Sequence, residues 1–120
     1  VQMGTRFVTT YECDASDEYK QAYINAKKED IRVVKSPVGM PGRAIYNEFM
    51  AKSEIETFKL KKCHQCISTC KGKDIPYCIT DALVNAANGD VDNALLFCGE
   101  KAYKATKLEH VSDIFKEIIG

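Results

Sequence analysis

Four of the six cysteines lie close together in the sequence, at Cys63, Cys66, Cys70 and Cys78, and His64 follows the first of them. Thiolate and imidazole groups are the ligands of tetrahedral zinc sites, and cysteines also bind iron–sulfur clusters. A zinc ion or an iron–sulfur cluster bound by these four cysteines is therefore one interpretation of this segment.

A second interpretation of the cluster is packing without metal. Cys63, Cys66 and Cys70 have the i, i+3, i+7 spacing of a helical core stripe, and buried cysteine behaves as a small hydrophobic residue. Residues seven apart on a helix are separated by ~10 Å along its axis. Two sulfurs on one zinc lie at most ~4.6 Å apart. One unbroken helix cannot bind a single ion through all three thiolates. A metal site would require a bend between Cys63 and Cys70, or only a pair such as Cys66 and Cys70 with Cys78 brought back by a turn at 71–76, and both interpretations stay open.

The segment Gln2-Met3-Gly4-Thr5 could bind an anion. A glycine lets the backbone approach phosphate oxygens closely, while the Thr5 hydroxyl and the Gln2 amide add donors. The tetrapeptide alone fits equally an ordinary turn between a strand and a helix, and that is the simpler interpretation of these four residues by themselves.

A third candidate is the segment Gly39-Met40-Pro41-Gly42-Arg43. Two glycines and a proline predict a loop that permits close backbone approach, and the guanidinium of Arg43 can donate to a carboxylate, a phosphate or a carbonyl. The loop could line the mouth of an active site, or Arg43 could brace a neighbouring backbone.

The remaining cysteines and the second histidine give weaker signals. A nucleophilic cysteine needs a basic partner, and the sequence indicates none for Cys13 or Cys98, so we expect both to pack in the interior. His110 precedes the last predicted helix, where a capping or surface role is expected.

The elements that position these residues follow from periodicity and capping. We expect a buried strand at the N-terminus, running into the Gly4 turn. Candidate caps and apolar spacing then predict a helix from about Asp14 or Ser16 to Lys28, a strand at 31–36, the loop at 38–42, a helix at 44–56, a helix containing Ile79–Ala86 that ends at Gly89, and a last helix containing Val111–Ile118.

The composition and length exclude several classes of protein. Lys plus Arg equals Asp plus Glu at 17 each, so no net positive charge attracts nucleic acid or anionic membranes. The longest apolar run, Ala94–Cys98, is far shorter than a membrane span. We expect a cytoplasmic protein with reduced cysteines. The 120 residues are too few for a whole (β/α)8 barrel, which needs about 250.

Several motifs in order along the chain resemble one enzyme family. They are QMGTRF at 2–7, ECDAS at 12–16, SPVGMPGRAI at 36–45, and FCG at 97–99 with Ala102 and Tyr103. Together they resemble the C-terminal third of the nitronate monooxygenases, formerly called 2-nitropropane dioxygenases. This family includes the flavin-containing type II enoyl-acyl-carrier-protein reductases.

The resemblance implies an α/β fold, the C-terminal segment of an FMN-binding (β/α)8 TIM barrel. Residues 1–30 would form the last βα unit of the barrel, and residues 31–120 a mostly helical subdomain containing the four cysteines. As an isolated piece the chain would be α+β and rich in helix. The rest of the barrel, supplied by a complementing N-terminal portion, or a second copy in a homo-oligomer would be its partner.

The resemblance also implies a function, FMN-dependent oxidation of small nitroalkanes or nitronates with dioxygen. FMN would be bound by Gln2, Met3, Gly4 and Thr5, and the substrate side lined by Gly39, Met40 and Arg43. The catalytic histidine of the family lies upstream, so this segment alone would be inactive. Two alternatives remain: an enoyl-acyl-carrier-protein reductase using NAD(P)H and FMN, and a non-enzymatic interaction module stabilised by metal at the cysteines.

Overall fold

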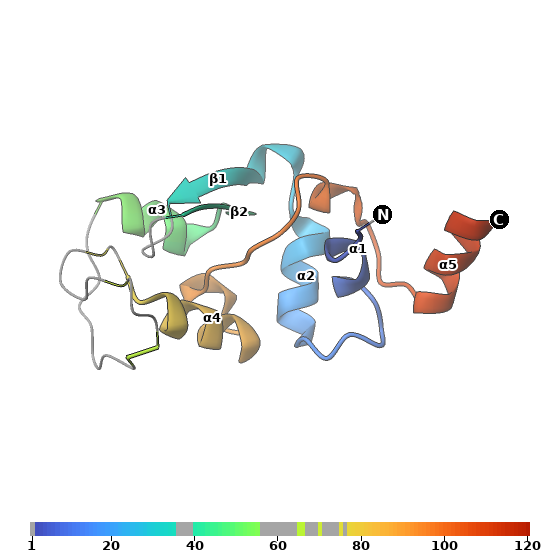
Figure 1. Cartoon of the computed structure of the whole chain (residues 1–120), viewed down its shortest axis with the longest axis horizontal. Coiled ribbons are helices and arrows are strands. Elements are labelled where there is room, and N and C mark those ends of the chain that lie inside the picture. The colour runs from blue at the N-terminus through green and yellow to red at the C-terminus, as the bar shows by residue number, and fades with distance from the viewer. Residues whose placement is uncertain (1, 36–39, 56–64, 67–69, 71–74, 76) are drawn as a thin grey trace.

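The computed structural model describes residues 2–35, 40–55, 65–66, 70, 75 and 77–120, and Figure 1 shows their arrangement. The described residues form helices and one small two-stranded antiparallel sheet, an α/β piece as the family resemblance implied. In order the elements are α1 (Thr5–Val8), α2 (Asp17–Asn25), η1 (Lys28–Asp30), β1 (Ile31–Lys35), β2 (Pro41–Ile45), α3 (Glu48–Ile55), α4 (Ile79–Ala87), η2 (Val91–Asn93), η3 (Ala102–Lys104) and α5 (Val111–Ile119).

The N-terminal strand that we predicted is not found among the described residues. Gln2 and Met3 have no regular secondary structure, and the short helix α1 begins at Thr5. A strand persists only when its N–H and C=O groups pair with a neighbouring strand. The described part of the chain places no strand beside these residues, which explains the difference.

Helix α2 begins as its sequence predicted. Ser16 is the N-cap, and its hydroxyl accepts a hydrogen bond from the backbone N–H of Tyr19 at 3.3 Å. Asp17 and Glu18 lie in the first turn, where carboxylates interact favourably with the helix dipole. The helix ends at Asn25, so the prediction that it continues to Lys28 was wrong, and Lys28 starts the 3-10 turn η1.

Strands β1 and β2 form an antiparallel pair in which Ile31 faces Ile45 and Val33 faces Arg43. β1 was predicted. For β2 the prediction was wrong, because it assigned Pro41 and Gly42 to a loop and started a helix at Ala44. Ile45 donates its N–H to the carbonyl of Leu96 at 3.0 Å, and these tertiary hydrogen bonds outweigh the helix preference of the sequence.

Helix α3 therefore starts only after β2 has ended. The side chain of Asn47 caps it by accepting a hydrogen bond from the Met50 N–H at 3.0 Å. The Asn47 amide also donates to the carbonyls of Val91 and Ala94, at 2.9 Å and 2.8 Å. The Asn47 side chain thus fixes the start of α3 and joins this helix to residues 91–94.

The segment 94–98 continues the sheet beside β2 and separates two hydrophobic clusters. It pairs with β2 through an antiparallel bridge between Ala44 and Phe97. Alternate residues face opposite sides, as in any strand: Ala94, Leu96 and Cys98 pack in one cluster with Tyr23, whereas Leu95 and Phe97 pack in the other with Phe49 and Tyr77. Burial on both faces explains why this is the longest apolar run in the sequence.

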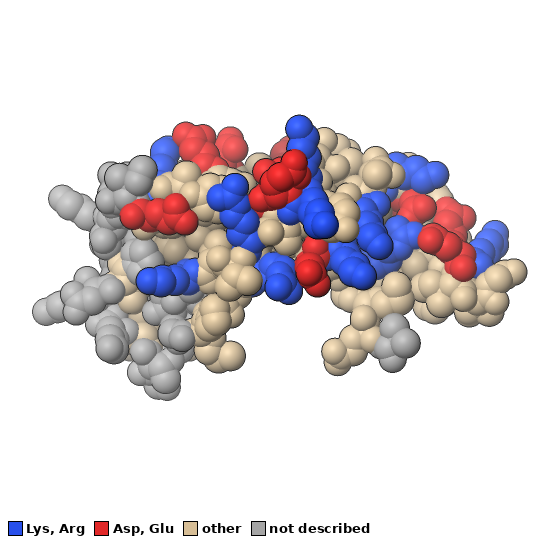
Figure 2. Space-filling model, turned by 90° about the horizontal axis from the view of Figure 1, so that it is seen from above, with Lys and Arg blue, Asp and Glu red and all other residues tan. Residues whose placement is uncertain are grey.

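The last two predicted helices are present. α4 ends before Gly89, whose φ of +87° suits glycine, and a Cβ there would lie 3.1 Å from the side-chain oxygens of Ser16 and Glu18. α5 lies at one end of the molecule in Figure 1. Among the described residues, no helix is long and apolar enough to cross a bilayer. Figure 2 shows basic and acidic side chains interspersed over the visible face.

Candidate functional site

The predicted anion-binding segment is accessible. Gln2, Met3 and Gly4 are exposed, and an added Cβ on Gly4 would have no atom within 4 Å. The space above the Gly4 backbone is therefore open to a ligand. The donors offered here are the Gln2 amide, backbone N–H groups and the Thr5 hydroxyl, all neutral groups suited to phosphate oxygens. This donor set and the open approach fit the phosphate group of FMN.

Thr5 contacts a part of the chain that is distant in sequence. Its hydroxyl oxygen accepts a hydrogen bond of 2.8 Å from the backbone N–H of Gly99. No sequence pattern placed Gly99 at this site, although its motif FCG was one of those that resembled the family. The contact joins the N-terminal segment to the strand-like segment 94–98.

Arg43, in the predicted substrate-side segment, contacts the residue next to Gly99. The backbone carbonyl of Arg43, in β2, accepts a hydrogen bond of 3.0 Å from the N–H of Cys98. Thr5 and Arg43 therefore contact adjacent residues, Gly99 and Cys98. The side chain of Arg43 is exposed, as is that of Met40, whereas Gly39 lies outside the described residues. The structure thus joins Thr5 and Arg43 through one backbone segment.

Gly42 shows why a glycine is needed next to Arg43. A Cβ at Gly42 would lie 2.4 Å from Cε1 of Phe97, so the aromatic ring crosses β2 only because no side chain is present. The sequence predicted close backbone approach in this segment, and the geometry confirms it for Gly42.

Cys98 is not arranged as a nucleophile. Burial raises the pKa of its thiol, and the nearby positive charge of Arg43 opposes that rise only in part. A raised pKa keeps the group as an unreactive thiol near neutral pH. Its side chain packs against the cluster that contains Tyr23, in agreement with the expected packing role.

The cysteine cluster is only partly described. Cys63 and His64 lie outside the described residues. Of the other three, Cys66 is exposed and its sulfur lies 2.8 Å from the Thr80 hydroxyl, while Cys70 and Cys78 are partly buried. Within the described ranges, no three potential ligands gather around one point. Binding of zinc or an iron–sulfur cluster at Cys63, Cys66, Cys70 and Cys78 stays a prediction.

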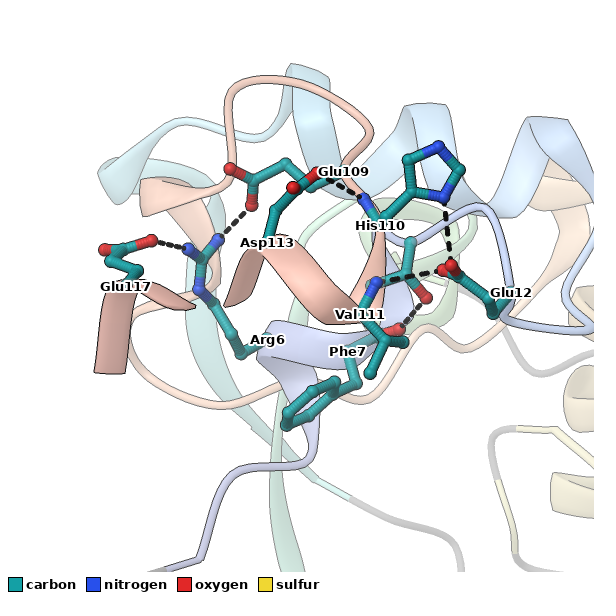
Figure 3. A network of polar contacts seen from close by, with 9 residues as sticks. Arg6, Phe7, Glu12, Glu109, His110, Val111, Asp113 and Glu117 are labelled. Atoms are coloured by element: carbon teal, nitrogen blue, oxygen red, sulfur yellow. Dashed lines mark hydrogen bonds and ion pairs between the residues drawn. The ribbon is translucent and has the colours of Figure 1, made fainter. Parts of the chain in front are cut away.

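His110 has the predicted capping role. It is the N-cap residue of α5, its backbone N–H donates to the Asp113 carboxylate, and its Nδ1 lies 2.9 Å from the Glu12 carboxylate. Figure 3 shows this network, in which the same Glu12 also accepts the N–H of Val111 at 3.0 Å. His110 therefore connects α5 to the N-terminal part of the chain.

Arg6 forms the other half of this network (Figure 3). Its guanidinium makes ion pairs with Glu109 at 2.7 Å and with Glu117 at 2.5 Å, so it binds residues before and within α5. The rings of Phe7 and Phe115 pack at a centroid distance of 5.9 Å. The residues directly after Thr5 are thus anchored to α5 by charge and by apolar contact.

The chain is similar to proteins of one family. The sequence model described as "Nitronate monooxygenase" matches residues 1–120. A probable nitronate monooxygenase of Staphylococcus haemolyticus is 30% identical over 125 residues, which covers 99% of this chain and 31% of that protein. A probable nitronate monooxygenase of Staphylococcus saprophyticus is 46% identical over 52 residues, 43% of this chain and 15% of that protein.

The chain is also similar in structure to a solved protein. The structure of FabK from Thermotoga maritima superposes with a TM-score of 0.75 at 25% identity, covering 99% of this chain and 35% of FabK. The chain therefore spans about a third of the length of FabK and of the Staphylococcus haemolyticus protein.

Proposed function

Because this chain belongs to the nitronate monooxygenase family, a family of flavin-type oxidoreductases, we propose that it contributes part of the FMN site of an enzyme oxidising nitronates with dioxygen. The observation that carries the proposal is the family match over all 120 residues. The open approach to Gly4 and the neutral donors beside it support the same assignment.

In this proposal Gln2, Met3, Gly4 and Thr5 bind FMN. The Thr5 hydroxyl and backbone N–H groups donate to the phosphate, and Gly4 leaves room for the phosphate to approach the backbone. Bound FMN would supply the redox chemistry between the substrate and dioxygen, and the protein supplies binding and orientation.

Arg43 would act on the substrate side, together with Met40 and Gly39. Its guanidinium is always charged and carries donors in a planar fork, which suits the two oxygens of a nitronate anion. The side chain is exposed on β2, while its backbone carbonyl is fixed by Cys98. A fixed backbone with an accessible charged end is suited to orienting a small anionic substrate.

FMN titration tests the proposal directly. We expect the chain to quench FMN fluorescence on binding, and Thr5→Val to weaken the affinity by roughly tenfold, since a hydrogen bond to a charged group is removed. Thr106→Val, a change at an exposed threonine in another loop, is the matched control and should leave the affinity unchanged. Absence of FMN binding by the unmodified chain would contradict an autonomous flavin site.

A second function, reduction of enoyl-acyl-carrier-protein with NAD(P)H, is favoured by the similarity to FabK. The two functions differ in the electron donor. An enzyme that contains this chain should take up oxygen when given an alkyl nitronate if the first holds. It should instead oxidise NADH or NADPH when given an enoyl thioester if the second holds, and each assay serves as the control for the other.

A further inference from the structure

The contact with Gly99 determines whether the Thr5 hydroxyl is available as a hydrogen-bond donor. A threonine hydroxyl has one proton to donate and two lone pairs that accept. The Gly99 N–H already donates to this oxygen at 2.8 Å. With its acceptor side engaged, the hydroxyl keeps its proton for another partner, and that partner must be an acceptor such as a phosphate oxygen.

The backbone around Gly99 is fixed from several directions. The adjacent Cys98 N–H donates to Arg43, Phe97 pairs with Ala44 in the sheet, and the Phe97 carbonyl accepts the hydroxyl proton of the buried Tyr23. On the other side, the Gly99 carbonyl accepts the Ala102 N–H at 3.2 Å. The Gly99 N–H that contacts Thr5 is therefore held in a fixed orientation by the sheet.

A side chain at position 99 would disturb this contact. A Cβ on Gly99 would lie 3.1 Å from the Thr5 hydroxyl oxygen and 3.8 Å from its Cβ. The first distance is shorter than normal contact, so the Thr5 side chain would have to move. Because threonine is stiff at χ1, such a movement redirects the hydroxyl.

From these contacts we infer that Gly99 is a positioning residue, whose N–H and missing side chain aim the Thr5 hydroxyl as a donor to the phosphate of the flavin. The inference rests on the proposed function, since it names what prepares that same site. A donor already oriented before binding loses less entropy on binding, so the arrangement raises affinity for a phosphate without any direct contact from the Gly99 side.

The experiment compares FMN with riboflavin, which lacks the phosphate, on the whole chain. We expect Gly99→Ala and Thr5→Val each to weaken FMN binding by roughly tenfold and to leave riboflavin binding unchanged, because only the phosphate contact is altered. Thr5→Ser keeps the hydroxyl and should retain FMN affinity. A general structural defect would instead weaken both flavins and lower the melting temperature.

A second measurement does not depend on flavin. In the ligand-free chain the Gly99 amide should exchange with deuterium faster in Thr5→Val than in the unmodified protein, because it loses its acceptor. The exchange measurement tests the contact between Gly99 and Thr5 even if Gly99→Ala does not fold. Equal exchange rates would overturn the inference.

The outcomes separate the two proposals. If the unmodified chain binds FMN and Gly99→Ala binds it equally well, the positioning role is wrong and the flavin site stands. If the unmodified chain binds neither flavin, it forms no flavin site on its own and the positioning role inferred here fails, while the proposal that the chain contributes part of a larger FMN site is tested by the nitronate assay on an enzyme that contains it. Loss of FMN selectivity over riboflavin in Gly99→Ala and Thr5→Val, with retention in Thr5→Ser, supports both.

Discussion

Tyr23 and Tyr77 are buried tyrosines whose hydroxyl groups have different partners. The Tyr23 hydroxyl donates to the carbonyl of Phe97 and lies 3.3 Å from the Tyr19 hydroxyl. The Tyr77 hydroxyl reaches the carbonyl of Lys35 only at 3.4 Å, beyond the usual range. Burial raises the pKa of both groups, that of Tyr77 to about 12, which further favours the neutral hydroxyl form.

We therefore expect Tyr23→Phe to lower the free energy of unfolding by about 1–2 kcal/mol, because it leaves a buried carbonyl without its donor. Tyr77→Phe is the matched control and should cost less than about 0.5 kcal/mol. Urea unfolding of the two variants measures the difference. Equal losses would show that the Phe97 carbonyl finds another donor, and would weaken the role given to this contact in fixing the 94–98 segment.

The cysteines differ in their expected reactivity. Cys66 is exposed, whereas Cys98 is half-buried and burial raises the pKa of its thiol. At neutral pH an alkylating reagent should modify Cys66 first and Cys98 much more slowly, with the Cys98 rate rising as the pH increases toward its raised pKa. Peptide mass mapping over time checks this order, and Cys66→Ser identifies the fast site. Equally fast modification of Cys98 would indicate that its burial is not maintained in solution.

Helix α5 is attached to the N-terminal segment by polar contacts. Glu12 binds His110 and the Val111 N–H, and the hydrogen bond from His110 is the main reason that the pKa of Glu12 lies below its ordinary value of 4.5. A lowered pKa in the folded state means that the ionised carboxylate stabilises folding above pH 4.5. This contribution is lost as the pH falls through the lower, folded-state value.

Glu12→Gln should accordingly destabilise the protein at about pH 7 and have a smaller effect at about pH 3, because the contribution of the ionised Glu12 carboxylate diminishes as the pH falls below 4.5. Glu100→Gln, at another exposed carboxylate, controls for the general change in charge. Urea unfolding at both pH values gives the comparison. An effect of Glu12→Gln that is the same at both pH values would contradict a charge-dependent attachment of α5.

The sequence predicted those elements whose signals are local. α2, α4 and α5 each have helical apolar spacing, and Ser16, Gly89 and His110 mark their ends as expected. β2 was missed because Ala44 and Ile45 are compatible with a helix, and only their pairing with β1 and Leu96 makes them a strand. That pairing joins residues far apart in sequence, which no local pattern contains.

The same limit applies to the candidate site in the whole molecule. The sequence indicated Gly4, Thr5 and Arg43 as candidates by residue type and by family resemblance. It could not indicate that Thr5 and Arg43 meet the neighbouring residues Gly99 and Cys98, because this depends on how segment 94–98 lies beside β2. The segment is central because it is buried on both sides, and it thereby links the N-terminal residues to the sheet.

Catalysis by the chain as a whole requires an acid–base group as well as a flavin site. The sequence contains two histidines, His64 and His110. His64 lies outside the described residues, while His110 is an exposed N-cap residue whose Nδ1 is paired with the Glu12 carboxylate. General acid–base catalysis needs a group within hydrogen-bonding reach of the reacting atoms. We expect the 120 residues alone to bind FMN but to give no nitronate-dependent oxygen uptake.

An oxygen electrode measures this uptake, with a full-length nitronate monooxygenase assayed in parallel as the positive control. His64→Ala and His110→Ala provide the decisive comparison, since each removes one of the two candidate bases. Uptake by the chain that either substitution abolishes would place the acid–base group within these residues. With no uptake but intact FMN binding, the chain would supply the flavin-binding and substrate-orienting groups, and proton transfer would require a residue that these 120 do not contain.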